Sequence, residues 1–288
     1  MACPTTALVT GATSGIGLAL ATELARRGAQ VVVHGRTETS TRSAVRAVRG
    51  STSGRVAGVV SDLCRQDLLR ALGQEVRHRF PALNLLVHNA GVLRSHCTLV
   101  DGHEETFAVN HLASYLLTHD LFGLLSANSP ARIVFVGSVA HSWGTIEWDD
   151  LAGRSWYEPE RAYAQSKLAS LLTSGELARR TAGTGVTVLT VNPGSTRTRL
   201  SAEIPGVVKA IEWFWRPFMR SATSVGRELA DVTLDPALAR VHGAYLARGI
   251  TNHPAPRALD VPTQRRMWRV SAQLTGLDAT WPQQALTA

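Results

Sequence analysis

The sequence predicts an α/β fold in which one parallel, doubly wound sheet carries helices on both of its faces. Short β-branched runs, such as residues 30–34 and 131–136, alternate with longer segments of helical period. These runs lack polar alternation, which is typical of strands buried on both sides. The 288 residues, 44% of them apolar, suit one large domain. We therefore expect a single domain over residues 1–288 with about seven strands.

The first half of the chain predicts four strands and the helices between them. Residues 7–10 predict the first strand, and a helix with one apolar face follows over residues 15–27. Because alternating β and α units connect through right-handed crossovers, successive strands should lie parallel in one sheet. The further strands are expected over residues 30–34, 55–60 and 84–88.

The second half continues the alternation and ends in a different kind of segment. Long helices are expected over residues 104–125 and 159–182, and a last helix near residues 263–274. Strands are expected over residues 131–136 and 186–191, with a short seventh strand over 244–246. In such a sheet, ligands bind beyond the carboxyl ends of the strands, and every motif below follows a strand.

The charge and the cysteines limit the classes of partner. The net charge of +8 comes from scattered side chains without a basic run interleaved with aromatics, so no nucleic-acid partner is indicated. An arginine-rich proteome or an anionic small ligand accounts for this charge. Cys3, Cys64 and Cys97 lack metal or disulfide spacing, so no metal site is expected. Without a targeting segment or an apolar stretch of about 18 residues, we expect a soluble, cytoplasmic protein.

A glycine-rich turn joins the first strand to the first helix. Glycine permits a sharp turn and a close approach of a pyrophosphate, and the helix N-terminus offers N–H groups and a positive dipole end. A position between a strand and a helix is the context that this motif requires. We therefore expect a dinucleotide site built from Gly11, Thr13, Ser14, Gly15, Ile16 and Gly17.

The end of the second strand indicates NADP(H) as the cofactor. An NAD site usually has an acidic residue here to hold the ribose hydroxyls, and no acid occurs before Glu38. Arg36 offers a planar cation suited to a 2′-phosphate, and Gly35 is expected to leave space for it. The alternative is that Arg36 is only a solvated loop charge. After the third strand, Asp62 and Leu63 are expected at the adenine, where Asp62 could also cap the next helix.

Four further residues carry the predicted chemistry. Tyr163 and Lys167 stand at i and i+4 on a predicted helix and so project side by side. The ammonium is expected to lower the Tyr163 pKa toward working pH, although such a pair also occurs on ordinary surface helices. Ser138 follows a strand and places a hydroxyl at the same edge of the sheet. Asn110 lies inside a predicted helix, where an amide is a poor helix former and needs a reason.

With Asn89, Ala90 and Gly91 after the fourth strand and Pro193-Gly194 after the sixth, these motifs resemble the short-chain dehydrogenase/reductase superfamily over about residues 5–200. One departure is His88, where the family commonly has a second asparagine. The resemblance implies a Rossmann-type domain. Its cofactor-binding part would cover about residues 1–140, and its catalytic and substrate-binding part about residues 138–288.

The resemblance also implies a role for each matching residue. Tyr163 would be the general acid in carbonyl reduction and the base in alcohol oxidation. Lys167 would hold the nicotinamide ribose, Ser138 would hydrogen-bond to the substrate oxygen, and Asn110 would position a relay water. The other cofactor contacts would be Asn89, Ala90, Gly91, Pro193, Gly194, Thr196 and Thr198.

A finer resemblance concerns the stretch around Trp148-Asp149-Asp150-Leu151 and the segment that begins at Tyr163, which look like the retinol-dehydrogenase-like branch. That branch mostly uses NADP(H) and handles hydrophobic alcohols, aldehydes or ketones. The Ala- and Arg-rich composition is typical of high-GC bacteria, where such enzymes often serve secondary metabolism. We therefore expect a ketoreductase-type oxidoreductase with an apolar carbonyl or alcohol as its substrate.

The substrate side is less sharply defined. Residues 195–221 could form a lid whose aromatic cluster includes Trp213 and Phe214. The same cluster could instead pack on the core or a partner subunit, or rest on a membrane surface. His141, Trp143 and Trp156 are candidate pocket residues, and His141 could equally be structural. A homodimer or homotetramer would pair the two long helices.

Two other functions stay open at this point. One is a regulatory protein that kept the fold and the cofactor but lost catalysis. The other is a non-redox biosynthetic enzyme, a cyclase or dehydratase, that uses the same pocket. The full catalytic set favours the oxidoreductase over both.

Overall fold

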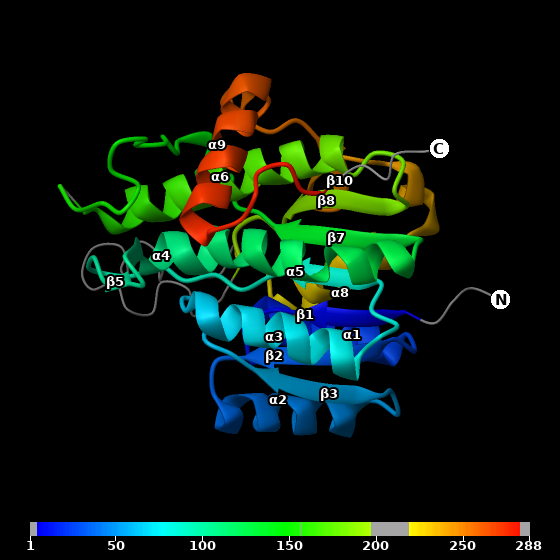
Figure 1. Cartoon of the computed structure of the whole chain (residues 1–288). Coiled ribbons are helices and arrows are strands. Elements are labelled where there is room, and N and C mark those ends of the chain that lie inside the picture. Colours follow the sequence, from blue (N-terminus) through cyan, green and yellow to red (C-terminus); the bar gives the residue numbers. More distant parts are fainter. Residues whose placement is uncertain (1–4, 156, 197–218, 283–288) are drawn as a thin grey trace.

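The computed structural model describes residues 5–155, 157–196 and 219–282. An eight-stranded sheet in the order β10-β9-β8-β7-β4-β1-β2-β3 runs through the middle of the molecule (Figure 1). All neighbouring pairs in it are parallel except β9 and β10. The chain reverses its direction of winding between β1 and β4, which makes this the topological switch point. The predicted Rossmann-type, doubly wound architecture is confirmed.

The seven predicted strands are all present, within one or two residues of their expected bounds. An eighth strand, β10 (Ile250–Asn252), was missed because its three residues are exposed and follow a tight turn, so they carry no apolar run. Two short strands, β5 (Leu99–Val100) and β6 (His103–Glu104), form a separate hairpin. The seven parallel strands are β1 (Thr6–Val9), β2 (Gln30–Gly35), β3 (Val56–Val60), β4 (Leu85–His88), β7 (Ala131–Val136), β8 (Val186–Asn192) and β9 (Ala244–Ala247).

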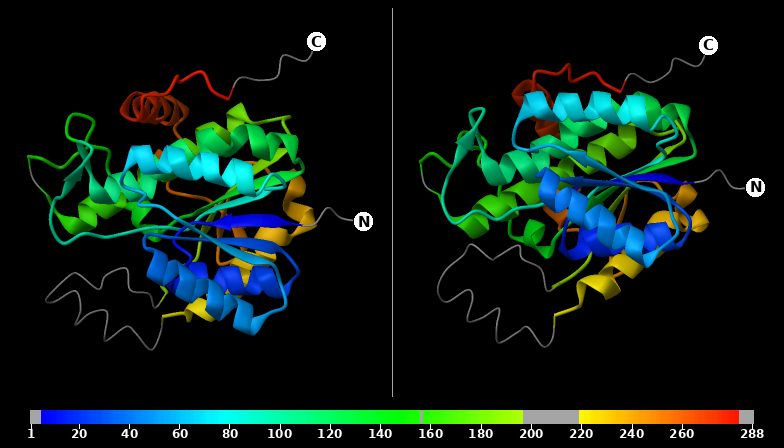
Figure 2. Two further views of the ribbon diagram at one scale, coloured as in Figure 1. Left: turned by 60° about the horizontal axis from the view of Figure 1, so that its bottom comes forward. Right: turned by 90° about the horizontal axis from the view of Figure 1, so that it is seen from below.

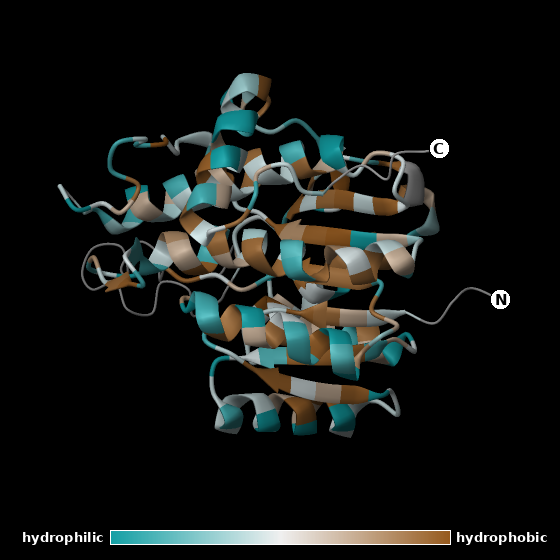
Figure 3. Ribbon diagram, viewed as in Figure 1, coloured by the Kyte–Doolittle hydropathy of each residue, from teal (hydrophilic) through white to brown (hydrophobic). Residues whose placement is uncertain are grey.

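Helices cover both faces of the sheet, as Figure 2 shows. One face carries α3 (Gln66–Arg79), α5 (Ala113–Ala127), α6 (Pro159–Arg180) and α9 (Val261–Thr275). The other face carries α1 (Gly15–Arg26), α2 (Glu38–Ser51) and α8 (Ala222–Leu234). Apolar strand residues fill both layers, and the helices turn their polar faces outward (Figure 3). None of the helices in the described ranges is long and apolar enough to cross a membrane.

The helix predicted over residues 104–125 is not one regular helix. It consists of α4 (Glu105–Phe107), a π-helical turn (Ala108–Leu112) and α5. The Glu104 carboxylate starts α4 by accepting from the N–H groups of Thr106 and Phe107, both at 2.7 Å. The π-helical turn contains Asn110, and such turns occur frequently at functional sites.

The segment after β7 forms a 3₁₀ turn, η2 (Val139–Ser142), which begins directly after Ser138. A second short turn, η5 (Pro256–Ala258), lies beside it, since the Ala255 N–H directly before η5 donates to Nε2 of His141 in η2 at 3.2 Å. Arg257 donates to the Gly144 carbonyl oxygen at 2.8 Å. Since the parallel strands all end at one edge of the sheet, the segments that follow β1, β4, β7 and β8 meet there. That edge is where the predicted site residues lie.

Candidate active site

The glycine loop between β1 and α1 has the geometry that a pyrophosphate site requires. Gly11 and Gly15 adopt φ angles of +62° and +55°, which glycine reaches without steric penalty. A Cβ atom at Gly17 would lie 2.3 Å from Nδ2 of Asn89 and 2.6 Å from the Gly11 carbonyl oxygen. The side chain of Ser14, the N-cap of α1, makes no capping hydrogen bond, which leaves the first N–H groups of the helix to an anion. These residues fit a dinucleotide.

Thr10 fixes this loop against the end of β4. Its hydroxyl donates to the Val87 carbonyl oxygen at 3.3 Å and accepts from the N–H groups of Asn89 and Ala90 at 3.0 and 3.1 Å. Nδ2 of Asn89 donates to the carbonyl oxygens of Thr10 at 2.8 Å and Gly11 at 3.2 Å. Sequence reasoning expected Asn89 only as a contact of the cofactor and missed this second role. It also missed Thr10, although a hydroxyl between a buried strand and a glycine is a usable signal.

The end of β2 departs from the expectation in one respect. Gly35 leaves no empty space on its Cβ side, because an added Cβ would lie 2.3 Å from Oγ1 of Thr41 and 2.4 Å from Cγ2 of Thr13. Glycine is therefore needed here for close packing of α2 and the glycine loop, and any room for a 2′-phosphate does not lie on the Cβ side of Gly35. Arg36 is exposed directly after the strand. The next acid, Glu38, forms an ion pair with Arg42 on α2.

Asp62 and Leu63 follow β3 at the same edge. Oδ1 of Asp62 accepts from the backbone N–H of Cys64 at 3.2 Å and from its thiol at 3.0 Å. The N-cap residue of α3 is Arg65, so Asp62 caps the turn before that helix rather than the helix itself. Leu63 is buried in the apolar core between the sheet and the helices α3 and α5.

Ser138, Tyr163 and Lys167 converge at the carboxyl end of β7. Tyr163 lies in the first turns of α6, and Nζ of Lys167 lies 5.7 Å from the centre of its ring. Lys167 is buried and donates to the Val136 carbonyl oxygen at 3.0 Å. Oγ of Ser138 accepts from the Ala140 N–H at 3.2 Å, which leaves its own hydrogen to donate elsewhere. The spacing in the sequence therefore predicted this juxtaposition correctly.

Burial controls the proton affinities of this group. It raises the pKa of Tyr163, and a hydrogen bond with Ser138 opposes that rise. It lowers the pKa of Lys167 to about 8. The pKa of the tyrosine is therefore not lowered in this chain, contrary to the expectation from the i, i+4 pair. At neutral pH the phenol is protonated and can act as an acid.

Asn110, in the π-helical turn, is hydrogen-bonded both to the segment after β4 and to α6. Its Oδ1 accepts from the Val92 N–H at 2.7 Å, and its Nδ2 donates to the Val92 carbonyl oxygen and to Oγ of Ser166, both at 2.9 Å. Its backbone carbonyl oxygen accepts from Oγ of Ser170 at 2.7 Å. Asn110 thus joins the loop after β4 to α6, which explains an asparagine inside a helix. Ser166 and Ser170 are supporting residues that sequence reasoning missed.

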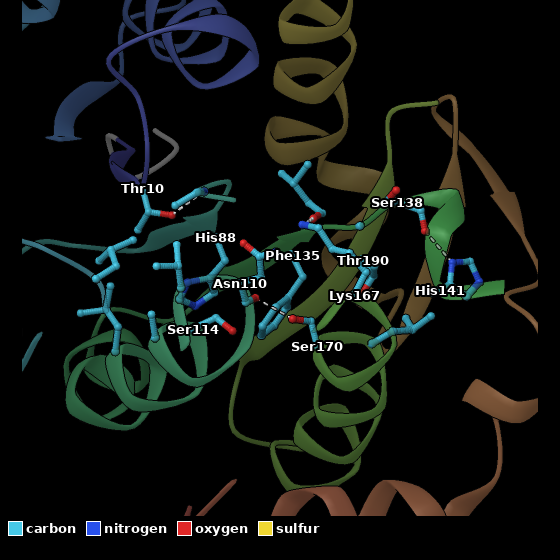
Figure 4. Close-up of a pocket in the computed structure, with 18 of the residues that line it drawn as sticks. Thr10, His88, Asn110, Ser114, Phe135, Ser138, His141, Lys167, Ser170 and Thr190 are labelled. Carbon is cyan, nitrogen blue, oxygen red and sulfur yellow. Dashed lines mark hydrogen bonds between the residues drawn. The ribbon is translucent and has the colours of Figure 1, made fainter. Parts of the chain in front are cut away.

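A cavity of about 20 Å³ lies between these groups, which is roughly the room that one water molecule needs. Asn110, Ser114, Lys167 and Ser170 line it together with His88 and Phe135, and all six are labelled in Figure 4. His88 also lines this cavity, but its Nε2 is already hydrogen-bonded to Oγ1 of Thr118 at 2.8 Å. Burial lowers the pKa of His88 to about 3, so it is neutral.

Of the residues predicted on the substrate side, His141 and Trp143 lie in the described structure. Nε2 of His141 accepts from the Ala255 N–H at 3.2 Å, so its Nδ1 carries the hydrogen and donates to the Ser138 carbonyl oxygen at 2.6 Å. Both ring nitrogens are thereby used, and the structural interpretation of His141 is the better one. Trp143, directly after η2, is 57% exposed, and Val139, the first residue of η2, is 49% exposed.

The loop after β8 is described only at its two ends. Gly194 has a φ of +73°, and Thr196 forms a parallel bridge with Arg220. Arg220 donates to the Pro193 carbonyl oxygen at 3.1 Å. The predicted residues Trp156, Thr198, Trp213 and Phe214, and most of the predicted lid, lie outside the described residues.

Comparison with known proteins agrees with this geometry. The family model for short chain dehydrogenase matches residues 5–206. The chain belongs to the short-chain dehydrogenase/reductase family of oxidoreductases, whose members use NAD(P). Human retinol dehydrogenase 13 is 36% identical and aligns with 96% of this chain and 88% of its own length. Bovine retinol dehydrogenase 12 is also 36% identical, over 94% and 86%. These relatives place the chain in the retinol-dehydrogenase-like branch.

Solved structures show the same fold. An uncharacterized protein from Mycobacterium paratuberculosis superposes with a TM-score of 0.76 at 30% identity, covering 96% of this chain and 97% of its own. A Beutenbergia cavernae protein, assigned as an NAD(P)-dependent gluconate 5-dehydrogenase and solved with NADP at low occupancy, gives a TM-score of 0.71 at 26% identity. That match covers 86% of this chain and 96% of the other.

Proposed function

We propose that this protein is an NADP(H)-dependent oxidoreductase that interconverts a hydrophobic ketone or aldehyde and its alcohol. The observation that carries the proposal is the convergence of Ser138, Tyr163 and Lys167 beyond a glycine loop that fits a dinucleotide. When bound, the cofactor supplies or accepts the hydride. The protein's own residues bind and orient the substrate and move the proton.

The proton step follows from the protonation states in the site. Because Tyr163 keeps its proton at neutral pH, it serves as the general acid in the reductive direction. The Ser138 hydroxyl donates to the substrate oxygen and stabilises the charge that develops on it. The Lys167 ammonium, 5.7 Å from the ring centre, stabilises the phenolate that remains. A water in the cavity beside Asn110 would return the proton through Lys167.

The preference for NADP(H) rests on the end of β2. Arg36 lies exposed there, at the N-terminus of α2, which is suited to a 2′-phosphate. The only acid nearby in sequence, Glu38, is held by Arg42 rather than turned to a ribose. The NADP reported for the Beutenbergia cavernae structure supports the same preference.

The substrate class rests on the surface beside Ser138. Val139 and Trp143 follow Ser138 closely in the chain, and their exposed side chains offer apolar surface there. Retinol, which the relatives' names give, is itself an apolar alcohol. We further propose that the enzyme works in the cytoplasm, where its cysteines would stay reduced; Cys64 and Cys97 are free thiols.

The test is turnover with NADPH or NADH and a panel of apolar ketones, aldehydes and quinones, followed by cofactor absorbance. We expect NADPH to be used in preference to NADH, and Arg36→Leu to remove most of that preference. Tyr163→Phe should lower turnover about 10²–10⁴-fold by removing the acid. Tyr157→Phe is the matched control, because its hydroxyl bonds to the Arg94 carbonyl oxygen, away from the catalytic group.

The outcomes separate the competing functions. Tight NADPH binding without turnover of any panel member would favour the non-redox use of the pocket. A Tyr163→Phe variant that still reduces the substrate at the wild-type rate would overturn the role of Tyr163.

A further inference from the structure

His34, the penultimate residue of β2, is a buried imidazole whose two nitrogens are both bonded to backbone groups. The residue is only 2% exposed. Its Nδ1 accepts from the Gly11 N–H at 3.2 Å, and its Nε2 bonds to the Ser61 carbonyl oxygen at 3.1 Å. Because the N–H can only donate and the carbonyl can only accept, the ring is neutral with its hydrogen on Nε2. Burial also lowers the pKa of His34 to about 4, against an opposing effect of Asp62.

These bonds join three segments that the cofactor site needs together. Gly11 opens the glycine loop, and Ser61 ends the β3 segment directly before Asp62. The His34 carbonyl oxygen accepts from the Ala12 N–H at 2.9 Å, which adds a second connection to the loop. Two residues further on stands Arg36. The imidazole, near the end of β2, therefore connects the glycine loop to the residue that directly follows β3.

No other side chain in the described ranges has a hydrogen bond to the Gly11 N–H. On its other side Gly11 packs so tightly that an added Cβ would lie 2.8 Å from Cα of Ala90. On the β4 side the loop is thus held by the Ala90 backbone and by the side chains of Thr10 and Asn89, and on the β2 side by the His34 imidazole and the His34 carbonyl oxygen. Loss of the imidazole would leave the half-buried Gly11 N–H and the buried Ser61 carbonyl oxygen without these partners, and the loop could relax only toward β2.

We infer that His34 is a positioning residue for cofactor binding, which sets the distance between the glycine loop and the ends of β2 and β3. The inference rests on the proposed dinucleotide site. It assigns no contact between His34 and the cofactor. Its effect acts through Gly11 and Ser61 and should appear in affinity for the adenosine end of the cofactor rather than in turnover.

Two conservative variants separate the two bonds. In His34→Asn, the amide atoms stand as far from the backbone as Nδ1 does, so the bond from Gly11 can be kept. In His34→Gln, they reach as far as Nε2, so the bond to Ser61 can be kept while that from Gly11 is lost. We expect His34→Gln to weaken binding of NADPH and of 2′,5′-ADP about 10-fold, the effect of one lost hydrogen bond to a buried group. We expect His34→Asn to restore most of that loss.

The measurements are dissociation constants for NADPH and 2′,5′-ADP, kcat at saturating NADPH, and the melting temperature of each variant. A structural role alone would lower the melting temperature without the difference between Asn and Gln in 2′,5′-ADP affinity. Tyr115→Phe is the control for the loss of one buried hydrogen bond elsewhere, since the buried Tyr115 hydroxyl on α5 accepts from Nε1 of Trp281 at 3.0 Å and contacts neither the glycine loop nor β2. Its affinity for 2′,5′-ADP should stay unchanged. Should His34→Gln not fold, His34→Ala, which removes both bonds without added bulk, should show the same weakening.

Unchanged affinity for 2′,5′-ADP in both His34→Gln and His34→Ala would overturn the inference. Failure of the unmodified protein to bind NADPH or 2′,5′-ADP at all would instead overturn the proposed cofactor site, so the two failures are distinguishable.

Discussion

The two sides of the active site are held in different ways. On the dinucleotide side, short bonds between backbone groups and small polar side chains, such as those of Thr10 and Asn89, fix the glycine loop. On the catalytic side, buried polar side chains on two helices hold one another, as Asn110 and Ser166 do. A substitution on the first side displaces the backbone, whereas one on the second changes a charge or a proton donor. Affinity and turnover should therefore respond to different residues.

The largest difference between the effect on turnover and the effect on cofactor affinity is expected for Lys167→Met, on the catalytic side. Removal of the ammonium takes away the charge that stabilises the Tyr163 phenolate, so turnover should fall about 10²–10⁴-fold. Affinity for 2′,5′-ADP should stay unchanged, because the glycine loop does not contact this side chain in the described structure. Single-turnover rates and a binding titration measure the two quantities. Comparable losses in both would break the distinction between the sides.

The same lysine predicts how turnover depends on pH. Since burial lowers the pKa of Lys167 to about 8, the ammonium is present below that pH and is lost above it. The reductive rate of the unmodified enzyme should therefore fall as pH rises through about 8. A rate measured at saturating NADPH that stays level up to pH about 10, the usual range of a lysine, would contradict this assignment.

The opposite result, a loss of cofactor affinity with little change in turnover, is expected for Gly17→Ala on the dinucleotide side. Its Cβ would lie 2.3 Å from Nδ2 of Asn89 and 2.6 Å from the Gly11 carbonyl oxygen, so the loop must shift. Overpacking of this kind should weaken NADPH binding about 10–100-fold. Turnover at saturating cofactor should change much less. Gly123→Ala in α5 has nothing within 4 Å of its added Cβ and is the matched control, with unchanged affinity.

The smallest effect is expected for Ser166→Ala, which tests how the catalytic side is supported. The change removes the acceptor of Nδ2 of Asn110 and the hydrogen bond to the Tyr163 carbonyl oxygen, at 2.9 and 2.7 Å. If these lost hydrogen bonds raise the activation free energy by about 1 kcal/mol, turnover should fall roughly 5-fold. Ser174→Ala, on the same helix, loses bonds to Leu171 and Thr190 instead. It should lower the melting temperature without that loss of turnover.

The sequence predicts the sheet well because apolar periodicity is a local property. The strand over residues 131–136 was placed with its observed bounds, since a run of six residues, five of them buried, can be recognised without knowledge of its partner strands. The glycine loop and the pair at Tyr163 and Lys167 were also found, because fixed spacings within one turn or helix define them. Local patterns therefore predicted the fold, and they also located the residues proposed to react.

The supporting contacts could not be predicted in this way. His34 and Gly11 are 23 residues apart, and Asn110 and Ser166 are 56 residues apart, so only the tertiary fold shows that they meet. Gly35 was assigned empty space because the sequence does not show Thr13 and Thr41 closing on it. The π-helical turn was read as regular helix, since one added residue hardly alters a pattern of apolar side chains.

That π-helical turn has a consequence for insertions and deletions in this part of the chain. A π-helical turn takes up one extra residue, so the helical segments on either side of it keep their orientation. Deleting one residue near Asn110 would close this turn into regular α-helix, with Leu116, Leu117 and Leu121 still buried against the sheet. The deletion would instead change the direction of the Asn110 side chain. The added residue is what allows one continuous helical segment to aim an asparagine at the site and an apolar face at the core. A variant shortened here by one residue should lose turnover while it keeps its fold.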